Sequence, residues 1–289
     1  MHRRQIYNAY MTFLEMLRAA QTHHQSMLCV GLDPDMGKLP THLPKTKSAV
    51  FDFCAAIVDA TAEMACSFKP QIAYFAAMGA ESELERLMRH MRDVAPHVPV
   101  ILDAKRGDIG STAEQYATEA FERYGADAVT LSPFMGHDSV TPYLKYKDKG
   151  VFLLCRTSNP GGDDLQNQRL MDEPGNPRLF EHVAQLAEGA WLNGGPQGQI
   201  GLVVGATYPA EIRRVRSLAP TAPLLIPGVG AQGGDAVATI QAGATAEGLV
   251  VVNSSRAIMY ASSGDDYAKA AQRVARDTRD TLNAARTTL

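Results

Sequence analysis

The sequence predicts an α/β fold in which eight parallel strands close into a (β/α)8 TIM barrel, with an extra N-terminal helix. Eight short apolar runs alternate with longer segments of helical periodicity, as parallel strands with crossover connections require. Polar or glycine-rich residues follow nearly every run, and a barrel gathers all eight strand ends on one face. An open doubly wound sheet, the competing architecture, would use only two or three strand ends at one switch point.

The predicted elements follow one another along the whole chain. Helical periodicity over about Arg4–Ala20 comes first, and we expect this helix to cover the bottom of the barrel. The predicted strands are Met27–Leu32, Cys66–Lys69, Val98–Asp103, Ala128–Leu131, Val151–Cys155, Ile200–Val204, Leu224–Ile226 and Gly248–Val252. The predicted helices are Ser48–Met64, Ser82–Asp93, Thr112–Tyr124, Arg178–Trp191, Pro209–Leu218, Gly234–Ala242 and Asp266–Ala285.

We expect residues 1–289 to form one barrel domain, with residues 1–26 as an N-terminal helical extension, because such barrels exceed 200 residues as single domains. Two connections are longer than usual: Met36–Lys47 after the first strand and Asn159–Pro177 after the fifth. The segment 159–177 is rich in Gly, Asp, Asn and Gln. We expect it to be a loop insertion over the active face and a candidate lid.

Composition and charge exclude several classes of partner. The net charge is −3 without a basic block, so neither nucleic acid nor an anionic membrane is an expected partner. No apolar run approaches the ~18 residues that span a bilayer, and no signal-peptide core is present, which favours the cytoplasm. The eight histidines lack metal-ligand spacing, so no metal site is predicted. We expect reduced, buried thiols at Cys29, Cys54, Cys66 and Cys155.

Five charged residues lie at or just beyond predicted strand ends: Asp33, Lys69, Asp103, Lys105 and Asp108. Side chains two apart on a strand share a face, so Asp103 and Lys105 project together. A structural ion-pair network at the barrel mouth is the alternative interpretation. A lysine between carboxylates stays protonated, which suits a general acid or electrostatic stabiliser better than a Schiff-base nucleophile.

A phosphate site is predicted at the last two strand ends. A glycine-rich stretch over 228–234 follows the seventh strand and opens a helix, and Arg256 follows the eighth. Barrels frequently bind phosphate with these two loops, although the glycine pattern alone could also be a turn. Ser158 follows the fifth strand without a matching His–Asp pair, so a hydrogen bond to substrate is favoured over a nucleophilic role.

The segment Asp103-x-Lys105-x-x-Asp108, followed by Ile109 and Thr112, resembles the signature of the orotidine 5′-phosphate decarboxylases. The residues at 103–108 are similar to those of the longer bacterial branch of that family. The resemblance spans residues 28–260, most of the chain. Its other matching segments are Val30–Asp33, Phe68–Gln71, Arg156–Gly161, Val204–Thr207 and Pro227–Gly233.

The resemblance implies conversion of orotidine 5′-phosphate to UMP and carbon dioxide in de novo pyrimidine biosynthesis, without a cofactor. It implies that Lys105 protonates ring carbon six and that Asp103 lies beside the substrate carboxylate. It also implies a homodimer with shared sites, in which Asp108, Ile109 and Thr112 reach into the neighbouring subunit's site. The remaining implied contacts are Asp33 and Lys69 with ribose hydroxyls, Ser158 and Pro227 with the pyrimidine, and Gln232 and Arg256 with phosphate.

Two rival functions stay open at this point. A magnesium-dependent keto-gulonate phosphate decarboxylase of the sister family shares the Asp-x-Lys-x-x-Asp pattern, but there a Glu that helps bind the metal matches Lys69. A lysine is wrong for a cation ligand. A non-catalytic nucleotide-binding barrel is disfavoured because a degenerate copy would lose Lys105 or an aspartate first, and all are present.

Overall fold

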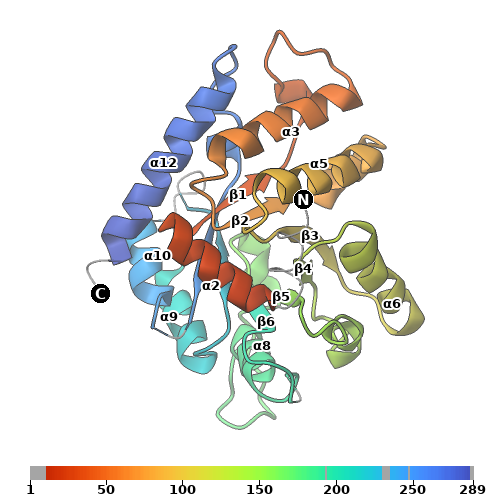
Figure 1. Ribbon diagram of the computed structural model, residues 1–289. Helices are drawn as coiled ribbons and strands as arrows, with labels where there is room; N and C mark the ends of the chain where they lie inside the picture. Colours follow the sequence, from red (N-terminus) through yellow and green to blue (C-terminus); the bar gives the residue numbers. More distant parts are fainter. Residues whose placement is uncertain (1–10, 193, 230–234, 247, 287–289) are drawn as a thin grey trace.

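The structure is a computed structural model that describes residues 11–192, 194–229, 235–246 and 248–286. Within these residues, eight parallel strands form one sheet in the order β2-β1-β8-β7-β6-β5-β4-β3. Bridges from Phe68 to Val100 and from Gln71 to Asp103 join β2 to β3 and close the barrel (Figure 1). The strands are β1 Leu28–Leu32, β2 Ser67–Pro70, β3 Ile101–Arg106, β4 Ala128–Leu131, β5 Gly150–Arg156, β6 Ile200–Val204, β7 Leu224–Pro227 and β8 Val250–Ser254. The predicted barrel is confirmed.

Helices surround the strands on the outside of the barrel (Figure 1). The α-helices are α2 Phe13–His24, α3 Lys47–Thr61, α4 Ile72–Ala77, α5 Glu81–Val94, α6 Gly110–Thr118, α7 Thr141–Leu144, α8 Leu179–Glu188, α9 Pro209–Leu218, α10 Ala236–Gly243, α11 Arg256–Met259 and α12 Tyr267–Arg286. The short 3-10 turns are η1 Met36–Lys38, η3 His137–Ser139 and η4 Pro160–Asp164. One prediction needs correction: the helix expected over Thr112–Tyr124 ends its α-helical part at Thr118 and continues as the π-helical turn η2 over Glu119–Arg123.

The helix α2 covers the bottom of the barrel, as expected, and lies across the front in Figure 1. It begins at Phe13 because Thr12 and Glu15 form a capping box, and the part of the predicted helix before residue 11 lies outside the described residues. Phe13 packs edge-on against Phe152 of β5, with ring centroids 5.7 Å apart. Leu17 joins the same inner cluster, whose other members lie on or next to the strands: Cys29, Cys66, Ile101, Ala128, Phe152, Val203, Leu225 and Val251.

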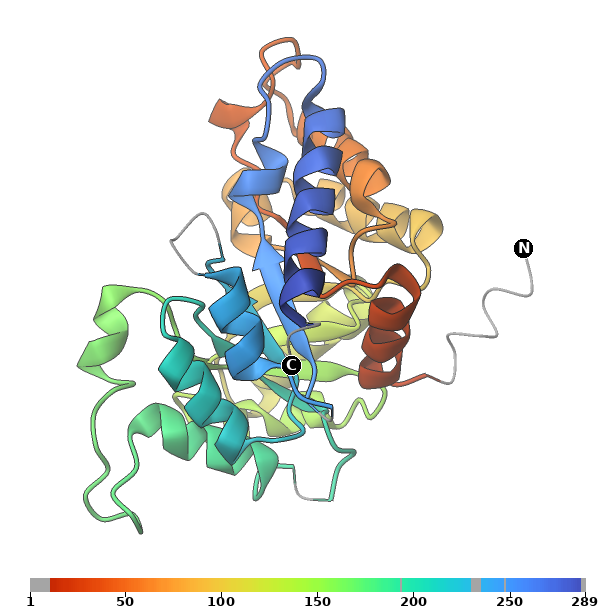
Figure 2. The ribbon, with the colours of Figure 1, turned by 90° about the vertical axis from the view of Figure 1, so that its left-hand side faces the viewer.

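The outer layer completes the apolar core between strands and helices. The helix α12 contacts α3, α10 and β1, and Figure 2 shows it on the outside of the barrel. The four cysteines are free and buried, which confirms the predicted reduced thiols, and burial raises the pKa of the Cys29 thiol to about 11. None of the helices in the described ranges is both long enough and apolar enough to cross a membrane.

Candidate active site

The polar centre forms the uppermost inward-facing layer of the barrel. Ile101 of β3 and Ala128 of β4 face the apolar barrel interior, and two residues further along, Asp103 and Thr130 take the equivalent inward positions. Lys69 of β2 reaches the same layer and contacts Asp103. The strand periodicity that fills the lower barrel with apolar side chains therefore delivers these polar groups to the carboxyl ends of the strands, where barrels bind substrate.

Two lysines share one buried carboxylate. Lys69 Nζ lies 2.7 Å from Asp103 Oδ2, and Lys105 Nζ lies 2.5 Å from Asp103 Oδ1. The exposed fractions of the side chains are 6% for Lys69, 9% for Asp103 and 46% for Lys105. The cluster is therefore more exposed at Lys105 than at Lys69.

The charges in this cluster hold one another ionised. Burial alone would raise the pKa of Asp103, but the ammonium groups of Lys69 and Lys105 outweigh it and keep that pKa well below its usual range. Burial alone would lower the pKa of Lys69, but Asp103 and, further away, Asp33 raise it above its usual range. At neutral pH the layer therefore contains a fixed carboxylate and a fixed ammonium.

The backbone of β3 is kinked where it presents Lys105. Lys105 has φ +48°, in the left-handed region that a residue with a side chain rarely adopts, and the pairing with β4 shifts register between Leu102 and Arg106. The backbone N–H groups of Ala104 and Lys105 both donate to Thr130 Oγ1 at 3.0 Å. Asp103 and Lys105 meet as predicted, but β3 extends to Arg106 rather than ending at Asp103, and simple strand alternation is broken between them.

Asp33 lies just beyond β1, beside this layer. Its main chain is clamped by the segment after α11: the Tyr260 hydroxyl donates to Asp33 O at 3.1 Å and accepts from Asp35 N at 2.7 Å. Asp33 N also points to Met259 Sδ at 3.1 Å. Asp33 Oδ1 is buried and has no hydrogen-bond partner within the described part of the chain, so this oxygen is free to accept a hydrogen bond from a ligand.

The loop after β3 carries the next three predicted residues, Asp108, Ile109 and Thr112. Asp108 Oδ1 accepts the neighbouring Ile109 N–H at 2.9 Å, and none of the ion pairs among the described residues joins Asp108 to Lys105. The side chains of Ile109 and Thr112 are exposed. Arg106 anchors the loop through Glu119 of η2, at 2.8 Å. Among the described residues, no ion pair therefore links Asp108 to the charged cluster of its own chain.

The remaining predicted residues lie at the ends of β5, β7 and β8. Ser158 packs closely on Gly205 after β6: a Cβ at Gly205 would lie 2.8 Å from the Ser158 backbone nitrogen, so only glycine fits. Pro227 ends β7 beside Asn253 of β8, and Arg256 opens α11 with an exposed side chain. Gln232, with residues 230–234 of the predicted phosphate loop, lies outside the described residues.

Arg156 is a buried residue at the end of β5 that was not among the predicted site residues. Its Nε lies 2.6 Å from Glu211 of α9, and its Nη2 lies 2.6 Å from Asp163 of η4. The guanidinium also lies over the Tyr208 ring, 4.6 Å from its centroid. Arg156 thereby ties the start of the 159–177 segment to the next strand–helix connection. Its sequence signal is an arginine that directly continues an apolar strand.

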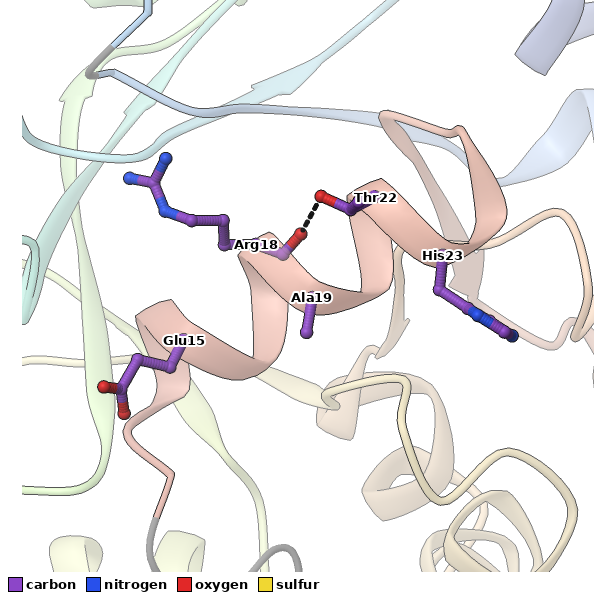
Figure 3. Close-up of a pocket in the computed structure, with 5 residues that line it drawn as sticks. All are labelled: Glu15, Arg18, Ala19, Thr22 and His23. Atoms are coloured by element: carbon purple, nitrogen blue, oxygen red, sulfur yellow. Dashed lines mark hydrogen bonds between the residues drawn. The ribbon is translucent and has the colours of Figure 1, made fainter.

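A separate pocket lies along α2 and is remote from this chemistry. Figure 3 shows its lining residues Glu15, Arg18, Ala19, Thr22 and His23 on one face of the helix. The opposite face of α2 packs into the bottom of the barrel, whereas the charged cluster lies at the carboxyl ends of the strands. The pocket therefore takes no part in the candidate active site.

Comparison with known proteins agrees with this geometry. Residues 26–273 match the family described as "Orotidine 5'-phosphate decarboxylase / HUMPS family". Orotidine 5'-phosphate decarboxylases of Paracidovorax citrulli and Polaromonas naphthalenivorans are 69% and 71% identical to this chain. Each alignment covers 96% of this chain, and covers 100% and 97% of those relatives respectively. The structure of Leishmania donovani OMP decarboxylase superposes with a TM-score of 0.82 at 39% identity, covering 96% of this chain and 100% of that one. The chain belongs to the orotidine 5'-phosphate decarboxylase / HUMPS family.

Proposed function

We propose that this chain decarboxylates orotidine 5′-phosphate to UMP and carbon dioxide. The observation that carries the proposal is the buried carboxylate of Asp103 held between two ammonium groups, of which that of Lys105 is the more exposed. Relatives about 70% identical over nearly the whole chain are orotidine 5'-phosphate decarboxylases, which supports the same substrate here. The activity of these relatives and the charged groups of the site therefore point to the same reaction.

The reaction needs an electrostatic device that this site supplies. When the bond from ring carbon six to the carboxylate breaks, carbon dioxide leaves and the electron pair remains on the ring carbon, without an adjacent carbonyl to delocalise it. The ammonium of Lys105 stabilises that charge and donates the proton that forms the new C–H bond. Asp103, ionised because of its neighbouring ammonium groups, repels the substrate carboxylate but not neutral carbon dioxide.

The other residues of the proposed site bind and position the nucleotide. We assign the ribose hydroxyls to Asp33, whose buried Oδ1 is free to accept, and to Lys69. Binding energy from such remote groups can hold the pyrimidine in a costly position at Lys105. The further assignments are Ser158 and Pro227 to the pyrimidine, and Gln232 and Arg256 to the phosphate.

A second copy of this chain completes the proposed site. Large apolar side chains are exposed on the loops after β3 and β4, where Ile109, Phe134 and Met135 are 41%, 76% and 50% exposed. Gly107 and Ser132 approach each other between these loops, so the two loops that carry the exposed groups are neighbours. We assign this surface to a homodimer in which Asp108, Ile109 and Thr112 enter the partner's site.

The mixed dimer tests this arrangement. Chains carrying Lys105→Ala are combined with chains carrying Asp108→Asn, each inactive alone. Shared sites predict that mixing restores activity, because one of the two sites in each mixed dimer receives both native residues. Activity that stays absent in a verified mixed dimer would show that Lys105 and Asp108 act within one chain.

The segment 159–177 is proposed as a lid, with its first turn held by the ion pair between Arg156 and Asp163. A long polar loop beside the active face can close over a bound nucleotide and exclude water. Shortening the exposed tip around Met171, which is 70% exposed, should lower affinity and turnover while leaving the Arg156 anchor intact. Full turnover and full nucleotide affinity after this deletion would contradict the lid.

The decisive assay follows the ultraviolet absorbance of orotidine 5′-phosphate with EDTA present. The proposal predicts metal-independent loss of substrate that Lys105→Ala abolishes. Lys269→Ala, which changes an exposed lysine on α12, is the matched control and should retain activity. EDTA-sensitive turnover of a sugar phosphate would favour the keto-gulonate phosphate decarboxylase, and tight UMP binding without turnover would favour the non-catalytic barrel.

A further inference from the structure

All three hydrogen bonds of the Thr130 hydroxyl go to Asp103, Ala104 and Lys105, the β3 residues at the charged cluster. Thr130 lies on β4, 1% exposed, in a strand whose other residues are Ala, Val and Leu. Its Oγ1 donates to Asp103 Oδ1 at 2.9 Å and accepts from the backbone nitrogens of Ala104 and Lys105, both at 3.0 Å. A hydroxyl has one proton and two lone pairs, so these three bonds saturate it.

The two accepted bonds are those that the kink in β3 requires. Regular pairing with β4 is interrupted between Leu102 and Arg106, so the N–H groups of Ala104 and Lys105 need partners outside the ladder. Lys105 adopts φ +48°, a conformation that persists only where the surroundings enforce it. Thr130 provides both N–H groups with one acceptor and so stabilises the strained turn.

The donated bond orients the carboxylate that faces both lysines. Asp103 Oδ1 accepts hydrogen bonds from Thr130 Oγ1 and Lys105 Nζ, and Asp103 Oδ2 accepts one from Lys69 Nζ. One hydroxyl group therefore fixes both the carboxylate of Asp103 and the backbone of Lys105. Apolar side chains of the same shape, such as valine, would fill the same space without making any of these bonds.

We propose that Thr130 is a positioning residue that sets the place of the Lys105 ammonium relative to Asp103 and the substrate. The inference rests on the proposed decarboxylation and adds a residue that does not itself touch the substrate. A misplacement of about 1 Å at a reacting group can cost about 100-fold in rate. Loss of the Thr130 hydroxyl should therefore act on kcat, while the nucleotide contacts that dominate affinity remain.

The test compares Thr130→Val, which keeps the shape, with Thr130→Ser, which keeps the hydroxyl. We expect Thr130→Val to lower kcat by about 10- to 100-fold with KM and UMP affinity within about threefold of the wild type. Thr130→Ser should restore most of kcat. Equal kcat for wild type and Thr130→Val, or equal loss in the Val and Ser variants, would overturn the proposal.

A matched control separates positioning from general destabilisation. Thr61 is equally buried in α3, and its Oγ1 donates to Ile57 O at 2.7 Å on the outside of the barrel. Thr61→Val should lower stability but leave kcat unchanged; a matching fall in its kcat would mean that the Thr130 effect is merely structural.

Wild-type turnover is measured first, so failure of the proposed function is seen separately. The geometry is then tested without turnover, by a crystal structure of Thr130→Val. We expect Lys105 to leave the left-handed region or its contact with Asp103. A structure in which both features persist would refute the positioning role even in a chain without decarboxylase activity.

Discussion

Replacing Asp103 by asparagine should show that Lys69 needs this carboxylate for folding stability far more than Lys105 does. Lys69 is 6% exposed and would be left with an uncompensated charge in the barrel, whereas Lys105 is 46% exposed and can be rehydrated. Removing one partner of a buried ion pair costs about 3–5 kcal/mol, against about 0–1 kcal/mol for an exposed pair. Because Asp33 also attracts Lys69, we expect Asp103→Asn to lower the free energy of unfolding by about 3 kcal/mol.

The decisive variant is the double substitution Asp103→Asn/Lys69→Met. It removes the stranded charge, so it should be more stable than Asp103→Asn alone by about 1–3 kcal/mol, the size of couplings between contacting residues. Lys105→Met is the control and should cost at most about 1 kcal/mol. Urea unfolding followed by circular dichroism at pH 7 and fixed protomer concentration measures all four chains. A double variant that is less stable than Asp103→Asn would refute the claim that the buried charge of Lys69 depends on Asp103 for compensation.

Three further outcomes are expected. Because the pKa of Asp103 is lower in the folded state, the stabilisation that its charge provides is complete above the unfolded-state pKa of about 4 and is lost as the pH falls below that value. In this acid range the urea midpoint should therefore fall more steeply for the wild type than for Asp103→Asn/Lys69→Met. Parallel pH curves for the two chains would contradict this. Tyr260→Phe, which removes the clamp on Asp33, should raise KM severalfold with kcat nearly unchanged; an unchanged KM would argue against the clamp. Arg256→Ala should reduce kcat/KM by the equivalent of about 1.5–3 kcal/mol, and an unchanged value would remove Arg256 from the phosphate site.

Features with a local cause were predictable from the sequence. The helix Pro209–Leu218 was predicted to the residue, because proline is favoured in the first turn of a helix and an apolar stripe follows it. Lys69, Asp103 and Lys105 come together because strand ends converge in a closed barrel, and their strands were recognisable as apolar runs. In both cases the determining information lies within a few residues of the element.

Features that depend on distant partners were not predictable in this way. The clamp on Asp33 comes from Tyr260, 227 residues further along the chain, and the saturation of the Thr130 hydroxyl requires the kink at Lys105 on another strand. The π-helical turn is a similar case, because Glu119 at its start pairs with Arg106 at the end of β3. Each involves a specific hydrogen bond or ion pair between segments, and residue spacing contains no signal for such a contact.

Folding stability alone does not account for the uppermost layer of this barrel. One layer below, the inward positions hold Ile101 and Ala128, and apolar groups in place of a buried ion pair are often neutral or stabilising. The upper layer instead contains a buried ammonium at Lys69, a strained backbone at Lys105 and an unsatisfied carboxylate oxygen at Asp33, as far as the described residues show. Three destabilising features at neighbouring strand ends are expected where pre-organised charges serve a reaction. A ribose hydroxyl that donates to Asp33, as proposed above, would remove one of these costs on binding.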